Sequence, residues 1–79
     1  MKFTLLYFAS LRDAAGCAQE SVASDASDPR ALYESAAVRH GFKMPLERVR
    51  VAVNGEFAAR DCALCDGDEV AFLPPVSGG

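Results

Sequence analysis

One well-delimited helix, set between two groups of strand-like segments, is the feature that most constrains the fold. Asp28 is a natural N-cap, Pro29 suits the first helical position, and Gly41 follows the last turn. The predicted apolar face of this helix contains Ala31, Leu32, Ala36 and Val38, and its predicted solvated face contains Arg30, Glu34 and Arg39. Tyr33 is predicted to pack at the edge of the apolar face. A chain of only 79 residues has room for one thin core, so this helix must cover a sheet.

The segments around the helix have the patterns of β-strands. Residues 2–9 are apolar on both faces, which is typical of a central strand or of one covered on its second face. A weakly alternating strand is predicted at residues 19–24. A half-buried strand is predicted at residues 49–53, where valines alternate with other side chains. Residues 56–58 and 69–73 complete the set of predicted strands.

Turn residues mark the connections between the later strands. Asn54 and Gly55 supply the positive backbone angles that a tight hairpin needs. The Asp-Gly-Asp sequence at residues 66–68 predicts a second turn. Pro74 and Pro75 lack the N–H donors of a strand ladder, so we expect the last strand to end before them.

A short helix is also predicted, beginning at Ser10 in a capping-box-like sequence and ending at Gly16. Apart from this helix, the order of elements is close to ββαβββ. We therefore predict an α+β fold of the β-grasp, or ubiquitin-like, class: a mixed sheet of about five strands with one main helix packed across it. The predicted domain covers residues 1–75, and residues 76–79 are expected to form a flexible C-terminal Gly-Gly tail.

Charge and hydropathy argue against several classes of function. The formal net charge is -3, the pI is about 4.9, and Lys and Arg are not clustered, so no nucleic-acid partner is expected. No stretch approaches the ~20 apolar residues of a membrane span, so no membrane partner is expected either. The apolar stretch at residues 3–9 is minimal for a signal peptide and is interpreted as a strand. Three cysteines, an odd number, fit a reducing, cytoplasmic location better than a secreted disulfide scaffold.

The sequence lacks the side-chain arrangements typical of pocket enzymes, such as a Ser/His/Asp set or a Gly-rich phosphate loop. The only histidine, His40, lies in the last turn of the main helix, where a cation interacts well with the helix dipole and caps carbonyls. Cys62 and Cys65 have the C-x-x-C spacing, but a zinc site needs four ligands and a redox motif should begin a helix. We therefore expect no metal site and interpret these cysteines and Cys17 as structural, with Leu64 in the core.

The end of the sequence carries the clearest functional signal. Pro74-Pro75-Val76-Ser77-Gly78-Gly79 directly follows the last predicted strand, and six extended residues reach about 20 Å. Because glycine has no Cβ, a Gly-Gly end permits close backbone approach inside a narrow channel. An enzyme that activates a C-terminal carboxylate needs such access. The carboxylate of Gly79 is therefore the predicted reactive group.

Two blocks of sequence resemble the family of molybdopterin synthase small subunits, which are sulfur carriers. The first block is Leu6-Tyr7-Phe8-Ala9-Ser10-Leu11-Arg12 with Gly16, and Val53-Asn54-Gly55 also fits the family. The second block is more specific: Asp66-Gly67-Asp68-Glu69-Val70-Ala71-Phe72-Leu73-Pro74-Pro75-Val76-Ser77-Gly78-Gly79. The resemblance extends over the whole chain in length and element order. Two features depart from it: Leu73 stands where relatives often have phenylalanine, and the Cys62/Cys65 pair is outside the pattern.

This resemblance implies a sulfur carrier that is not an enzyme on its own and binds no cofactor itself. An E1-like activating enzyme would use ATP to adenylate the Gly79 carboxylate, and a persulfide from a sulfur donor protein would convert it to a thiocarboxylate. The large subunit of the synthase would then accept the tail and supply catalytic lysines. Two sulfur transfers to cyclic pyranopterin monophosphate would build the molybdopterin dithiolene, within a heterotetramer.

The resemblance also implies roles for individual residues. Gly79 would be the covalent carrier, with Gly78 and Ser77 as the adjoining tail. Docking to the partner proteins is predicted for Phe8, Arg12, Leu73, Pro74, Pro75 and Val76. For Phe8 and Leu73, packing in the core is the alternative interpretation.

Three other functions stay open on the sequence. A thiamine-pathway sulfur carrier would use the same chemistry with a different acceptor, although the Phe8-Ala9…Arg12 block and Pro74-Pro75 argue against it. A ubiquitin-like protein modifier would be activated in the same way before forming isopeptide bonds. A small redox or zinc protein would act through Cys62 and Cys65.

Overall fold

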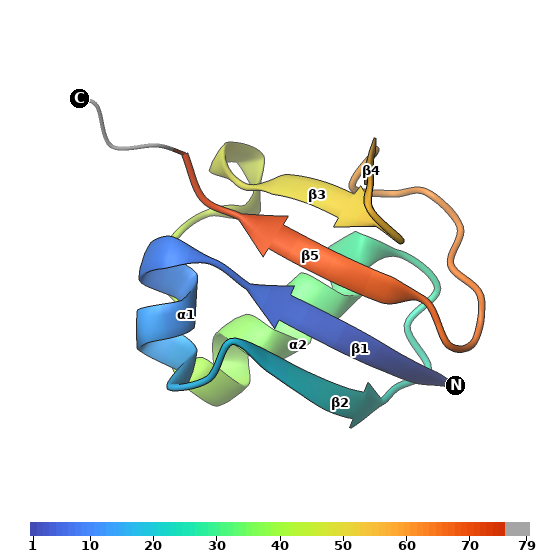
Figure 1. Ribbon diagram of the computed structural model, residues 1–79, viewed down its shortest axis with the longest axis horizontal. Coiled ribbons are helices and arrows are strands. Elements are labelled where there is room, and N and C mark those ends of the chain that lie inside the picture. The colour runs from blue at the N-terminus through green and yellow to red at the C-terminus, as the bar shows by residue number, and fades with distance from the viewer. Residues whose placement is uncertain (76–79) are drawn as a thin grey trace.

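The computed structural model describes residues 1–75, which form a five-stranded sheet with one long helix across one face (Figure 1). The predicted tail, residues 76–79, lies outside the described residues. In chain order the elements are β1 (Lys2–Tyr7), α1 (Ala9–Ala15), β2 (Gln19–Ala23), α2 (Pro29–His40), the 3-10 helix η1 (Leu46–Arg48), β3 (Arg50–Val53), β4 (Glu56–Ala58) and β5 (Glu69–Leu73).

The strands lie in the order β2-β1-β5-β3-β4, so the first and last strands of the chain are neighbours. β1 and β5 are parallel, whereas the pairs β1–β2, β3–β5 and β3–β4 are antiparallel. The sheet is therefore mixed, and α2 crosses behind it (Figure 1). This arrangement confirms the predicted β-grasp fold and the central place predicted for the first strand.

Alternate residues of the central strands form the core under α2. Phe3, Leu5 and Tyr7 of β1 are buried, as are Val70 and Phe72 of β5. The core also contains Leu11, Leu32, Tyr33, Ala36, Leu46, Val49, Val51 and Leu64, and Leu64 occupies the position predicted for it. Within residues 1–75 no buried side-chain nitrogen or oxygen lacks a hydrogen-bond partner. The covered face of the sheet is thus apolar, and the buried polar side-chain atoms of residues 1–75 are all hydrogen-bonded.

The predicted faces of the main helix are partly wrong. Val38 is 85% exposed, and Tyr33, predicted at the edge, is 3% exposed and donates a hydrogen bond of 2.6 Å to the Met44 carbonyl. The buried residues of α2 are Pro29, Leu32, Tyr33 and Ala36. That spacing is the i, i+3, i+4, i+7 stripe of a helix, and Val38 lies on its opposite side. The predicted ends are confirmed: Asp28 accepts a bond from the Ala31 amide, and Gly41 has φ 72°.

The first strand is shorter than predicted and the short helix begins earlier. β1 ends at Tyr7, and α1 begins at Ala9 with Phe8 as its N-cap and no side-chain capping bond, so the capping box predicted at Ser10 is wrong. Ala9 has φ 51°, which turns the chain sharply out of the sheet directly after Phe8. Gly16, at φ 76°, ends the helix as predicted.

The predicted hairpin is confirmed at Asn54 and Gly55, which have φ 52° and 87°. The Asn54 side chain also accepts from the Glu69 amide and donates to Asp68, so the hairpin is tied to the start of β5. No helix in residues 1–75 has the length and apolar character required to cross a membrane.

Candidate functional site

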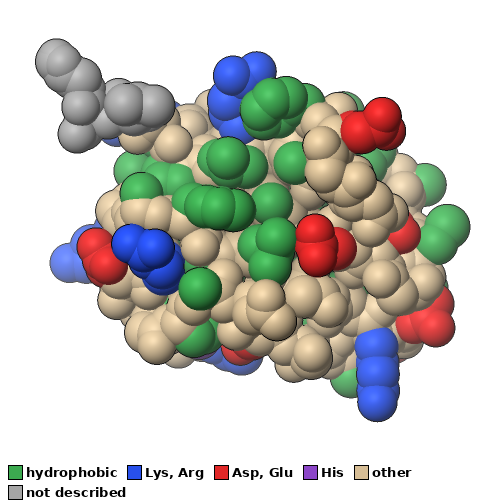
Figure 2. Space-filling model, in the orientation of Figure 1, with side chains coloured by type: hydrophobic (Ala, Val, Ile, Leu, Met, Phe, Trp, Pro, Cys, Tyr) green, Lys and Arg blue, Asp and Glu red, His purple; other side chains and the backbone are tan. Residues whose placement is uncertain are grey.

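The face of the sheet opposite α2 carries a row of apolar side chains. Within residues 1–75, no helix packs across this face as α2 packs across the other. Cross-strand pairing aligns Leu6 with Ala71, Ala71 with Ala52, and Ala52 with Phe57, so one row crosses β1, β5, β3 and β4. Figure 2 shows hydrophobic side chains gathered across the middle of this face. We call this surface the open face and define it by Leu6, Phe8, Ala52, Phe57, Ala71 and Leu73.

Phe8 and Leu73 lie on the open face and not in the core. Both line a shallow depression of about 260 Å³. The other four open-face residues line it too, as do Gly55 and Glu69. Phe8 is 43% exposed and Leu73 is half-buried. Core packing, the alternative interpretation for these two side chains, is therefore wrong. Their position on an accessible apolar surface is what a docking role requires.

The open face adjoins the last described residues of the chain. Leu73 is the last residue of β5, Pro74 after it is half-buried, and Pro75 is exposed. The prolines end the strand, as predicted, because they cannot donate to its ladder. Val76, Ser77, Gly78 and Gly79 lie outside the described residues. Arg12 is exposed on α1.

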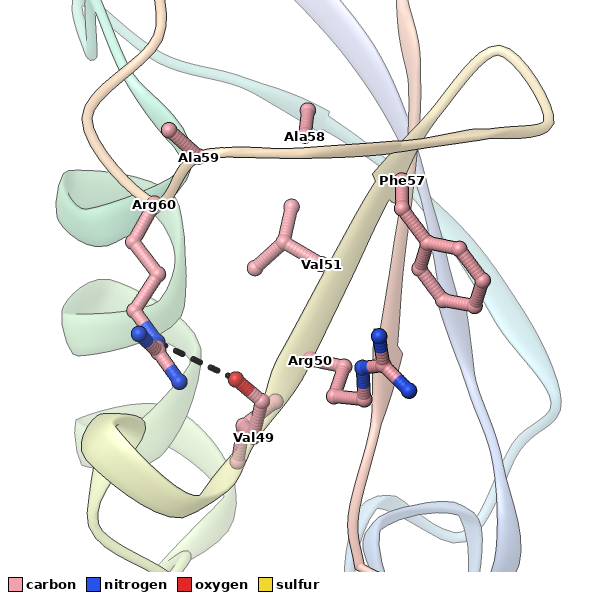
Figure 3. A pocket seen from close by; sticks show the side chains of 7 residues that line it. All are labelled: Val49, Arg50, Val51, Phe57, Ala58, Ala59 and Arg60. Carbon is pink, nitrogen blue, oxygen red and sulfur yellow. Dashed lines mark hydrogen bonds between the residues drawn. The ribbon is translucent and has the colours of Figure 1, made fainter.

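Phe57 is the most exposed aromatic side chain of the open face, at 66%. The guanidinium carbon of Arg50 lies 4.4 Å from the centre of its ring, within the range of a cation–π contact. Figure 3 shows Arg50 and Phe57 on one side of β3 and Arg60 on the other. Arg60 has a structural role, since it donates to the carbonyls of Leu46, Glu47 and Val49 and so ties the segment after β4 to η1 and to the residue before β3.

A polar cluster on the other side of the molecule ties β1 and β2 to the end of α2. Glu20 accepts hydrogen bonds from the Tyr7 hydroxyl and from Arg39 at 3.0 Å, and its Oε2 lies 2.8 Å from His40 Nε2. Burial and the neighbouring Glu20 carboxylate raise the pKa of Tyr7 well above its ordinary value, so its hydroxyl stays protonated and donates. His40 therefore faces a carboxylate, not the helix carbonyls that the sequence favoured.

The pKa of Glu20 is lowered although burial by itself would raise it. The bonds from Tyr7, His40 and Arg39 stabilise the carboxylate and outweigh that desolvation. Each member of the cluster is thus bonded to another member. We interpret the cluster as a structural clamp on the edge strand β2.

The cysteines do not form a site within the described part of the chain. Cys17, Cys62 and Cys65 are free thiols; the first two are half-buried, and Cys65 is exposed in the loop before β5. Among residues 1–75, no three His, Cys, Asp or Glu side chains are arranged to hold a metal ion. Cys62 and Cys65 precede a strand and begin no helix, unlike the cysteines of a thioredoxin-like redox motif.

The sequence did not predict Leu6, Ala52, Phe57 or Arg50 as parts of a site. Period-two alternation does put Leu6 on the opposite side from Leu5, and the hairpin at Asn54 fixes Phe57 beside Ala52. The alternation in the first strand and the position of Phe57 after the hairpin could therefore have indicated an exposed apolar face. The pairing of β5 between β1 and β3, which joins the row, had no local signal.

Comparison with known proteins gives matches over almost the whole chain. Residues 5–79 match the ThiS family. The molybdopterin synthase sulfur carrier subunit of Escherichia coli is 38% identical over 78 residues, covering 95% of this chain and 96% of the relative. The subunit of the same name from Mycobacterium tuberculosis is 33% identical over 82 residues, covering 100% and 99%.

Solved structures agree with the fold. SAMP1 from Haloferax volcanii superimposes with a TM-score of 0.82 at 28% identity, covering 100% of both chains. A putative molybdopterin converting factor subunit 1 from Pyrococcus furiosus has a TM-score of 0.79 at 34% identity, covering 96% of this chain and 99% of the other. A complex of subunits 1 and 2 of molybdopterin-converting factor from Helicobacter pylori contains a chain with a TM-score of 0.68 at 25% identity, covering 100% of both chains.

Proposed function

Because this chain belongs to the ThiS family, we propose that it is the sulfur carrier subunit of a molybdopterin synthase and that Gly79 carries the sulfur. The observation that carries the proposal is identity of 38% and 33%, over nearly the full length, to sulfur carrier subunits of molybdopterin synthase. The β-grasp domain supplies the body of such a carrier. It acts within a complex and is not a catalyst by itself.

The chemistry begins with a carboxylate, which is a poor electrophile. ATP and an activating enzyme convert the Gly79 carboxylate into an acyl-adenylate and release pyrophosphate. The outer sulfur of a persulfide then attacks the acyl-adenylate and displaces AMP, which gives an acyl disulfide. A second thiol breaks the S–S bond of this intermediate, which leaves a thiocarboxylate on Gly79 and a disulfide on the donor side. Two such carriers deliver two sulfur atoms to cyclic pyranopterin monophosphate, and each transfer regenerates the carboxylate.

The chain's own contribution is to present its end and to dock. The open face is apolar, accessible and continuous with Leu73, Pro74 and Pro75, which precede the tail. We propose that this face binds the large subunit and that the activating enzyme binds the same region. Arg12, which is exposed on α1, is a further proposed contact. The complex of two subunits known for the Helicobacter pylori relative supports the first partner. Such an assembly would work in the cytoplasm as a heterotetramer.

Changing the position of the terminal carboxylate tests the proposal. One residue added after Gly79, or deletion of Gly79, shifts the carboxylate by ~3.3 Å, and misplacement near 1 Å already costs about a hundredfold in rate. We expect neither variant to form a thiocarboxylate when it is incubated with the activating enzyme, ATP and a sulfur donor. The Gly79→Ala variant should lose less of this reaction. Intact-mass measurement detects the thiocarboxylate as one oxygen replaced by sulfur.

The matched control is thermal unfolding, which these changes should leave unaltered. Normal cofactor synthesis by an extended chain that is not trimmed contradicts the proposal. Carriers attached to lysines indicate a protein modifier instead. A thiocarboxylate that sulfurates a thiamine precursor but not the pterin indicates the thiamine pathway.

A further inference from the structure

Arg50 is a cation on the open face with no ion-pair partner in the described part of the chain. The ion pairs of residues 1–75 join Arg30 to Glu47, and Arg39 and His40 to Glu20. Arg50 is exposed, and its guanidinium is held over the Phe57 ring at 4.4 Å. A contact through the ring uses none of the five N–H donors of a guanidinium, so these stay available to an incoming group.

The position of Arg50 relative to the tail is fixed by strand pairing. Arg50 lies directly opposite Leu73, the last residue of β5, after which the chain leaves the sheet at Pro74. This cation therefore marks the end of the open face from which the tail starts. Phe57 belongs both to the open-face depression and to the smaller hollow of about 180 Å³ that Arg50 lines (Figure 3).

The opposite end of the open face carries the opposite charge. Glu69, the first residue of β5, is exposed, lines the same depression and pairs with Thr4 of β1. Glu69 and Leu73 are four residue steps apart along β5, which is ~13 Å. The apolar row that crosses the sheet thus lies between an acidic end and a basic end.

We propose that Arg50 fixes the orientation of the docked large subunit by pairing with a carboxylate of that subunit beside the exit of the tail. A planar guanidinium matches a carboxylate with two parallel hydrogen bonds, which gives direction as well as affinity. A partner docked the other way round would place its carboxylate against Glu69, and like charges at an interface disfavour the wrong arrangement. The apolar row supplies affinity, and the two charges supply direction.

The charge of the whole chain favours a local contact by Arg50 over long-range electrostatic steering of the partner. The formal net charge is -3, so the field at a distance repels acidic partners. Arg50 attracts a carboxylate only at short range, once the apolar surfaces have met. The effect of removing it should therefore be seen mainly in the dissociation rate.

The test measures binding of purified large subunit to the full carrier chain by surface plasmon resonance. Arg50→Glu is expected to weaken the complex about tenfold or more, mainly through faster dissociation, and Arg50→Gln less. Lys43→Glu is the matched control, since it makes the same change in charge at an exposed site that lines a different hollow, beside Ser10 and Met44. It should change affinity less than about twofold. Thermal unfolding of all variants should match the wild type.

The carboxylate is identified by changing each exposed Asp and Glu of the large subunit to Arg and measuring binding to Arg50→Glu. One of these changes is expected to restore affinity with Arg50→Glu while weakening the complex with the wild-type carrier. The inference rests on the proposed function, but the two fail differently. A wild-type carrier that does not bind the large subunit refutes the proposed function. A wild-type carrier that binds, with Arg50→Glu equally tight or with no restoring change, overturns the role of Arg50 alone.

Discussion

Phe72 and Leu73 are neighbours on β5, yet they belong to two different surfaces of one sheet. Phe72 points to the face covered by α2 and is fully buried, whereas Leu73 lies half-buried on the open face. On the covered face, α2 and the clamp around Glu20 satisfy both the apolar and the polar groups. On the open face an apolar row lies beside Arg50, a cation that has no ion-pair partner among residues 1–75. One face stabilises the domain, and the other is the face that we propose a partner binds.

The largest expected effect comes from truncating the covered face. Phe72→Ala should lower the free energy of unfolding by about 3–5 kcal/mol, because it leaves a cavity among Tyr7, Tyr33 and the core aliphatic side chains. Urea titration measures this change. Phe57→Ala, on the open face, is the matched control and should cost less than about 1 kcal/mol. Similar losses for the two phenylalanines would break the distinction between the faces.

A charge placed on the open face should act on binding and not on folding. Leu73→Asp is expected to weaken the complex with the large subunit by about 1.5–3 kcal/mol, the transfer free energy of one leucine, while the melting temperature of the isolated chain stays near that of the wild type. Calorimetric titration and thermal unfolding give the two numbers. A sharp fall in stability without a specific loss of binding would move Leu73 to the covered side.

The clamp on the covered side should make stability depend on pH in the acid range. Because the pKa of Glu20 is lower in the folded chain than its ordinary value of 4.5, its contribution is fully present above that pH and is lost as pH falls through the folded pKa. Glu20→Gln should lose about 1–2 kcal/mol at neutral pH. The difference between variant and wild type should shrink as the solution is acidified. A constant difference from pH 7 to pH 3 would contradict this role of the carboxylate.

The smallest effect is expected at Cys62 and Cys65, which do not line the open-face depression. Replacing Cys62 and Cys65 together with serine should leave sulfur transfer nearly intact, since the proposed sulfur site is Gly79. Thiocarboxylate formation by intact mass and pterin conversion are the readouts. If a folded double variant is inactive, a redox or metal role for the pair regains support.

The sequence by itself determined the local elements of this protein. Asp28, Pro29 and Gly41 marked the ends of α2, and Asn54-Gly55 marked the hairpin, because capping bonds and positive φ angles are properties of a few adjacent residues. β5 was predicted with its observed ends. From these elements the β-grasp class followed, since one helix and this set of strands have few ways to bury their apolar sides.

Only the tertiary structure decided which side chains share a surface. The sequence placed Val38 on the buried side of α2 and Tyr33 at its edge. In the structure Tyr33 is buried in the core and Val38 is exposed to water. The open face needs β5 to lie between β1 and β3, and that pairing joins residues far apart in the chain. Period-two alternation tells which residues of one strand share a side, but not which strand lies beside it. The pairing of Arg50 with Leu73 and the contacts of Glu20 with Tyr7, Arg39 and His40 were therefore fixed by long-range packing.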